Sequence, residues 1–198
     1  MKKISLFILS VFTLGVTLAQ TVSDFDFVPT TTDNNMSVVF PAGTLNDFVG
    51  GSLMAFKADG TPVSAASPVA EDGSGGIAAI GTDAMCGCDY LSGGDQLAFA
   101  ILLDGEIIVI TDVDPPLTYA ANTFKMISGS LDFTIDGAPV VSGCADSDYL
   151  EYDGANLDDG SCATLIVEGC IYAFACNFYA DANVDDGSCS YTEEGYDC

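Results

Sequence analysis

An acidic motif that ends in cysteine occurs twice near the C-terminus, and it constrains the fold more than any other feature. ANLDDGSC at residues 155–162 recurs as ANVDDGSC at residues 182–189. A unit of this length cannot bury much apolar surface, so cross-links or a bound metal ion must hold it together.

Residues upstream extend each motif into a longer repeat. Gly143-Cys144 matches Gly169-Cys170, and Tyr152 matches Tyr179. The predicted repeats are residues 143–162 and 169–189.

Six of the eight cysteines lie in residues 143–198. Six cysteines allow 15 pairings, and the sequence alone does not choose among them. The repeat boundaries suggest the pairs Cys144–Cys162 and Cys170–Cys189, which leaves Cys176 with Cys198. Wide spacing disfavours zinc binding. Cys86 and Cys88 are expected to be a loop staple or to pair with another thiol, the alternative being a strained, redox-active disulfide.

The first 19 residues predict export. Lys2 and Lys3 precede an apolar run from Ile4 to Leu18, and small residues end the segment at Ala19. This pattern is typical of a secretory signal peptide, removed so that the chain begins at Gln20. An exported chain meets an oxidising compartment, where an even number of cysteines indicates disulfides. We therefore expect a secreted or cell-surface protein without a membrane-inserted segment.

Charge and composition exclude several functions. The chain has 29 acidic residues, no His, and only Lys57 and Lys125 as bases after residue 19, which gives 2 − 29 = −27 for residues 20–198. Such a charge opposes binding to nucleic acid or to an anionic membrane. Without His, a His-based triad and a His-ligated metal are excluded. A hydrophobic content of 49% still predicts a packed core.

Composition divides the rest of the chain into two modules. Residues 20–142 hold both bases, and residues 143–198 hold six cysteines, 13 acids and no base. The first module predicts an all-β fold, a β-sandwich of about eight strands, because short runs rich in Val, Ile and Phe alternate with turn residues. The second predicts a small, loop-dominated, disulfide-rich acidic repeat module.

Eight runs are the expected strands. They are residues 24–28, 36–40, 52–57, 76–80, 96–103, 106–113, 123–127 and 131–135. Between two of them, Asp104-Gly105 predicts a two-residue hairpin turn with positive φ angles. Residues 44–49 are expected to form one helical turn.

The segments CADSDYLEYDGANLDDGSC and GCIYAFACNFYADANVDDGSC resemble short Cys-bounded repeats of secreted and surface proteins from Bacteroidota, especially marine flavobacteria. The stretches NNMSVVF, VGGSLMAF, IAAIGTDA and GGDQLAFAILLDGEI are similar, more loosely, to a β-rich domain of unknown function in such proteins. The resemblance implies a surface or secreted role and brings no catalytic residues with it.

The acidic loops are candidate Ca²⁺ sites. Asp181, Asn183 and Asp185 alternate as in the first half of an EF-hand loop, but Asp186 occupies the position of the EF-hand glycine, so the loop is not an EF-hand. The predicted ligands are Asp181, Asn183, Asp185 and Asp186 in the second repeat and Asp153, Asn156, Asp158 and Asp159 in the first. The alternative is a tight turn before a disulfide, in which Asn and Asp cap their own backbone and Gly takes φ > 0.

A non-catalytic extracellular role agrees best with these features. Paired carboxylates can hydrolyse glycosides, but with 29 acids close pairs arise by chance, so we expect no enzyme. The leading hypothesis is adhesion, matrix or cell-surface assembly, with an extracellular glycan or a surface protein as partner. The alternatives are a carbohydrate-binding module and a β-sandwich subunit that self-assembles through its edge strands.

Overall fold

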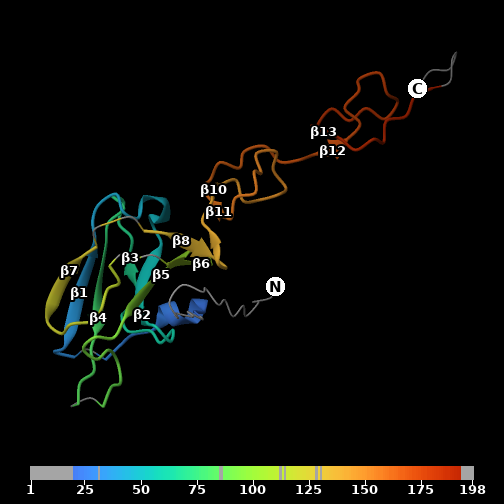
Figure 1. Cartoon of the computed structure of the whole chain (residues 1–198). Coiled ribbons are helices and arrows are strands. Elements are labelled where there is room, and N and C mark those ends of the chain that lie inside the picture. The colour runs from blue at the N-terminus through green and yellow to red at the C-terminus, as the bar shows by residue number, and fades with distance from the viewer. Residues whose placement is uncertain are drawn as a thin grey trace. The chain divides into compact units, whose positions relative to one another are not determined.

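The computed structural model describes residues 20–30, 32–84, 87–111, 113, 115–127, 129 and 131–192. The chain divides into two compact units between Val140 and Val141, and each is described by itself (Figure 1). The structure is all-β, with several sheets and with disulfides in the C-terminal region, which confirms the predicted fold class.

The first unit contains two short 3-10 helices and nine strands among its described residues. These are η1 (Val22–Asp26), β1 (Asn35–Phe40), η2 (Asn46–Phe48), β2 (Ser52–Lys57), β3 (Ser67–Pro68), β4 (Gly75–Ile80), β5 (Leu97–Leu103), β6 (Glu106–Ile110), β7 (Thr123–Met126), β8 (Phe133–Ile135) and β9 (Ala138–Pro139). Seven of the eight expected strands are present, and η2 lies inside the expected helical turn. The last three residues of the expected strand 106–113 lie beyond the end of β6.

The larger sheet has the strand order β3-β2-β5-β6-β8-β9, and all its pairs are antiparallel. Its central hairpin joins β5 to β6 through Asp104-Gly105, with Leu103 opposite Glu106. Asp104 has φ 51° and Gly105 has φ 88°. These positive angles match the twist of the flanking strands, which confirms the predicted turn.

The smaller sheet has the order β4-β1-β7, in which β1 pairs antiparallel with β4 and parallel with β7. Burial alternates along strand β1, in which Met36, Val38 and Phe40 are fully buried and the residues between them are partly exposed. This period of two places one apolar face against the larger sheet.

The two sheets pack face to face as a sandwich (Figure 1). Phe40 of β1 meets Phe99 of β5 edge-to-face, with ring centroids 5.4 Å apart. Register places Leu53, Ala55 and Ile101 on the same face of the larger sheet as Phe99, and all are fully buried. The core of the first unit therefore lies between the sheets.

Strands β2 and β5 are buried on both faces, which explains their unbroken apolar sequences. On the outer face, Phe56 contacts Phe25 of η1, with ring centroids 5.9 Å apart. The expected strand at residues 24–28 was therefore wrong. Asp24 caps η1, since its carboxylate accepts the N–H of Thr21 at 2.7 Å, and the helical turn aims Phe25 at the sheet.

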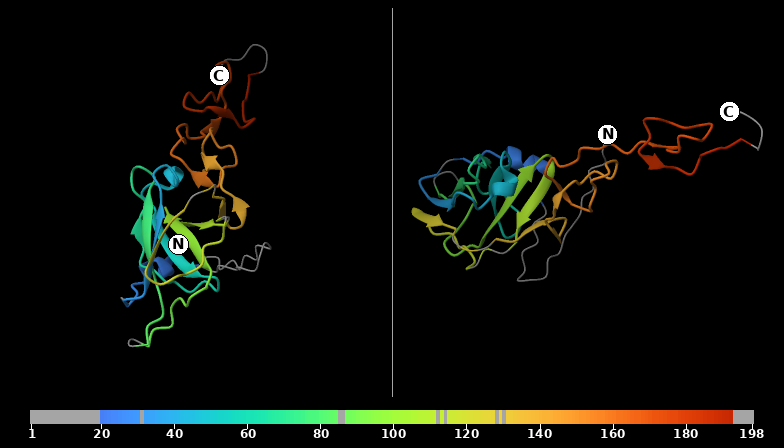
Figure 2. Two further views of the ribbon diagram at one scale, coloured as in Figure 1. Left: turned by 60° about the vertical axis from the view of Figure 1, so that its left-hand side comes forward. Right: turned by 90° about the horizontal axis from the view of Figure 1, so that it is seen from above.

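The second unit is built of loops with very short strands (Figure 2). Its strands pair in parallel, two per repeat: β10 (Ser142–Gly143) with β11 (Leu157–Asp158), and β12 (Glu168–Gly169) with β13 (Val184–Asp185). Buried apolar residues are few here, as expected for a unit of this size.

Candidate functional site: the acidic repeat module

Each repeat is a loop closed by one disulfide. Cys144 bonds to Cys162, and Cys170 bonds to Cys189, with Cα atoms 4.9 Å apart in both. These are the pairs that the repeat boundaries suggest. Cys176 is also disulfide-bonded, whereas Cys198 lies outside the described residues.

The asparagine of the motif ties the start of each repeat to its end. The Oδ1 atom of Asn156 accepts the N–H of Val141 at 2.7 Å, and Oδ1 of Asn183 accepts that of Val167 at 2.8 Å. Nδ2 of Asn183 donates to the carbonyl of Leu165 at 2.8 Å. These bonds replace the ladder of a longer sheet, because a two-residue strand pair offers few backbone partners.

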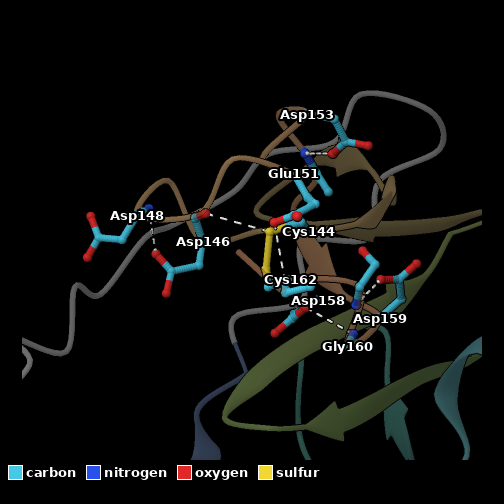
Figure 3. Close-up of a disulfide and its surroundings, with 12 residues drawn as sticks. Cys144, Asp146, Asp148, Glu151, Asp153, Asp158, Asp159, Gly160 and Cys162 are labelled. Atoms are coloured by element: carbon cyan, nitrogen blue, oxygen red, sulfur yellow. Dashed lines mark hydrogen bonds between the residues drawn. A yellow bond between two sulfur atoms is a disulfide. The ribbon is translucent and has the colours of Figure 1, made fainter. Parts of the chain in front are cut away.

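The acidic pair of the motif forms two consecutive side-chain turns. Oδ1 of Asp158 accepts the N–H of Gly160 at 3.0 Å, and Oδ1 of Asp159 accepts that of Ser161 at 2.9 Å (Figure 3). In the second repeat, Asp185 and Asp186 accept from the corresponding N–H groups at 3.1 and 2.8 Å.

Glycine follows the acidic pair because it supplies the positive φ that this turn needs. The φ angle is 80° at Gly160 and 74° at Gly187. Hydrogen bonds from the hydroxyl and N–H of Ser161 lower the pKa of Asp159, and those of Ser188 lower the pKa of Asp186. In the turn formed by Asp-Asp-Gly-Ser, these hydrogen bonds therefore favour the ionised form of the second carboxylate, Asp159 or Asp186.

Glu151 is a structural residue that the sequence analysis missed. Its Oε2 atom accepts the N–H groups of Thr164 at 2.9 Å and Ala163 at 3.2 Å, just beyond the disulfide. The hydroxyl and N–H of Thr164, with the N–H of Ala163, lower the pKa of Glu151 to about 2. Asn177 holds the same place in the second repeat, where its Oδ1 accepts the N–H of Ser190 at 2.8 Å.

Backbone pairing corrects the alignment of the repeats. Cys144 bridges to Tyr152, and Cys170 bridges to Phe178 in the same parallel sense. Tyr152 therefore corresponds to Phe178, and the match to Tyr179 was wrong. The second repeat follows the first by 26 residues up to Phe178 and by 27 residues within the acidic motif. The difference arises because the second repeat has one extra residue between Phe178 and the motif.

The predicted Ca²⁺ ligands are distributed around each loop. Asp153 accepts the N–H of Ala155 at 3.1 Å, and Figure 3 shows its carboxylate on a different side of the loop from that of Asp158. Asn156 and Asn183 bond to backbone, as described above, and Asp181 is exposed. Within the described part of the chain, no group of three or more His, Cys, Asp or Glu side chains forms a metal-holding cluster. Calcium binding by these residues stays a prediction.

The two lysines of the first unit have different surroundings. Nζ of Lys57 lies 3.7 Å from the carboxylate of Asp89. Lys125 lines a pocket of about 250 Å³ whose walls are mainly apolar, including Leu117 and Met126. Cys88 is disulfide-bonded, while Cys86 lies outside the described residues.

Comparisons with protein-family models, with curated proteins and with solved structures found no match. Over the described ranges, no helix reaches the length and apolar content required to cross a bilayer.

Proposed function

We propose that this chain is a secreted, non-catalytic extracellular protein that acts in adhesion, matrix or cell-surface assembly. The observation that carries the proposal is the pair of disulfide-closed acidic repeats. A unit with so small a core depends on its cross-links, and structural disulfides persist in oxidising compartments. The resemblance to Bacteroidota surface proteins supports the same location.

Five carboxyls have the electrostatics of turn caps and not those of a general acid. A general acid needs a raised pKa, so that it still holds its proton at neutral pH. Among the described residues, every carboxyl with a resolved shift has a lowered pKa: Asp59, Asp72, Glu151, Asp159 and Asp186. In each, hydrogen bonds from the backbone and from a nearby Ser or Thr hydroxyl lower it. These groups cap turns and hold no proton to donate.

Calcium is proposed as a weak ligand of the acidic turns. Adjacent carboxylates without a positive partner repel one another, and a bound divalent ion offsets that repulsion. Ca²⁺ takes six to eight oxygen ligands, so backbone carbonyls and water must complete any site at Asp185 and Asp186. The competing explanation is screening by salt, which requires no site.

A second candidate function is self-assembly through an edge strand. β7 ends the order β4-β1-β7 and exposes Phe124 by 60% and Met126 by 57%. An exposed apolar edge strand is a template for pairing with another chain. Filaments or oligomers that form with rising concentration and disappear in Phe124→Lys favour this function.

The export part of the proposal is tested in cells that make the full chain with a C-terminal tag. We expect the product outside the cytoplasm, beginning at Gln20, with no thiol that reacts with iodoacetamide before reduction. The binding part is tested by retention of the purified chain on cell-surface and matrix preparations. A chain that stays in the cytoplasm with reactive cysteines refutes the proposal.

A further inference from the structure

The second repeat exposes a set of large apolar side chains, among them two rings at positions where the first repeat has carboxylates. Phe174 is 93% exposed and Tyr172 is 52% exposed. We name this set the aromatic surface: Ile171, Tyr172, Phe174, Phe178, Tyr179 and Tyr191. Single exposed apolar residues are ordinary, whereas several on one short loop are characteristic of an interaction site.

The backbone of the repeat holds the aromatic surface in place. Two successive turns form it, since the N–H of Ala175 donates to the carbonyl of Tyr172 at 2.9 Å and that of Phe178 to Ala175 at 3.2 Å. The N–H of Cys176 donates to the carbonyl of Ser190 at 2.8 Å, which places Tyr191 beside the same segment. Because the backbone of this cross-linked loop is already held, binding orders only the side chains of the rings.

The amide of Asn177 fixes the same segment from a second direction. Its Nδ2 atom donates to the carbonyl of Ser188 at 2.8 Å, while its Oδ1 atom accepts the N–H of Ser190. The disulfide Cys170–Cys189 closes the loop.

The first repeat shows that the fold does not need these rings. It closes the same two turns, with the N–H of Tyr149 donating to the carbonyl of Asp146 at 3.2 Å and that of Tyr152 to Tyr149 at 3.2 Å. With the 26-residue shift, Tyr172 stands where the first repeat has Asp146, and Phe174 stands where it has Asp148. The same two turns thus carry carboxylates at these two positions in the first repeat and rings in the second, so closing the turns does not require Tyr172 and Phe174.

Charge identifies the chemistry of the partner. Residues 143–198 contain 13 acids and no base, and Glu168, Asp181, Asp185 and Asp186 are all exposed in the second repeat. A second copy of this chain or an anionic lipid surface is repelled by them. A lysine- or arginine-rich surface is attracted, and guanidinium and ammonium groups also bind the faces of aromatic rings.

We propose that the aromatic surface docks a lysine- or arginine-rich surface of another extracellular protein. This inference rests on the proposed extracellular function and adds the partner's chemistry. The carboxylates around the loop attract the cations, and the rings of Tyr172 and Phe174 contact the guanidinium planes and the apolar stems that carry them.

The first experiment replaces the two rings by the residues that the first repeat uses. A nona-arginine peptide is titrated into the full chain and into Tyr172→Asp with Phe174→Asp at 150 mM salt. Charge alone predicts tighter binding to the variant, which carries two more negative charges. The proposal predicts the opposite sign, a weakening of about 5- to 30-fold, from about 0.5–1 kcal/mol for each exposed ring.

The second experiment transfers the rings to the first repeat. Asp146→Tyr with Asp148→Phe removes two charges but reproduces the aromatic turn, so we expect a second binding site and a stoichiometry of two peptides per chain. The matched control is Val22→Asp with Val28→Asp, which adds the same two charges at exposed apolar residues of the first unit and is expected to leave the affinity unchanged or slightly tighter. Hydrogen exchange at the Val167 amide verifies that the second repeat is folded in each variant, and exchange at the Val141 amide does the same for the first repeat.

Tighter or unchanged binding of nona-arginine by the ring-to-Asp variant, with Val167 still protected, overturns the proposal. A variant that loses binding to a neutral hexasaccharide but not to nona-arginine also overturns it, in favour of a glycan-binding surface. Retention on cell-surface preparations distinguishes a failure of the docking proposal from a failure of the proposed extracellular function. If the wild type and the variant are retained equally, the docking proposal fails while the extracellular function stands; if neither is retained, the binding function fails as well.

Discussion

Removing one disulfide tests whether each repeat is a separate unit of stability. Cys144 and Cys162 are 18 residues apart in the sequence, and closing a loop of that length stabilises the folded state by about 3 kcal/mol in the chain-entropy model. The variant Cys144→Ser with Cys162→Ser therefore opens the first repeat about 100-fold more often.

Hydrogen exchange resolves this effect along the chain. In the first repeat, the Val141 amide donates to Asn156 and the Asp159 amide donates to the carbonyl of Gly143. We expect both to lose protection in the double-serine variant. The Val167 amide reports on the second repeat through Asn183, and the amides of β2 report on the sandwich. Both are expected to keep their protection.

The matched control is Cys170→Ser with Cys189→Ser, which is expected to deprotect Val167 and to spare Val141. Loss of protection in β2 to the same degree as in the first repeat contradicts the division into separate units. Loss of both repeats together in either variant contradicts their independence.

Three further predictions follow from particular residues. Phe40→Ala destabilises the first unit by about 3–5 kcal/mol, because it empties a site between the sheets, and Phe124→Ala by less than about 0.5 kcal/mol in the same urea titration. The pKa of Glu151 is lowered when the repeat is folded, so ionised Glu151 stabilises the repeat above the ordinary pKa of 4.5, and this stabilisation is lost as the pH falls toward about 2. Hydrogen exchange at the Thr164 amide, followed as a function of pH, measures the loss, and Glu151→Gln is expected to abolish this pH dependence. Calcium at 100 times its dissociation constant is expected to raise the stability of the second repeat by about 2.7 kcal/mol. Asp185→Asn reduces this gain, whereas the control Asp104→Asn does not. An equal gain in sodium chloride of the same ionic strength refutes the calcium site.

Most of the sandwich was predictable because its signals are local. Alternation in β1 and the Asp104-Gly105 turn depend on residues that are neighbours in sequence. The segment at residues 24–28 has similar apolar spacing, but there the structure is determined by the packing of Phe25 against Phe56 on the outer face of β2. A contact between segments about 30 residues apart cannot be predicted from the sequence of either segment alone.

The candidate site was predictable only in part, for the same reason. The motif itself revealed the repeat and the acidic turn. The capping role of Glu151 depends on Ala163 and Thr164 lying beside it, and the sequence does not place them there. The exposure of the rings in the second repeat depends on how the loop folds, so the linear sequence does not predict it.

The charge of the repeat module is compatible with its stability. Thirteen carboxylates without a base repel one another. Asp159, Asp186 and Glu151 nevertheless have lowered pKa values, because each accepts hydrogen bonds from a Ser or Thr hydroxyl and from backbone N–H groups. A lowered pKa means that folding favours the ionised form. At these three positions the turn stabilises the negative charge and the charge stabilises the turn. The proposed cationic partner is therefore not required to offset the charge of these three carboxylates.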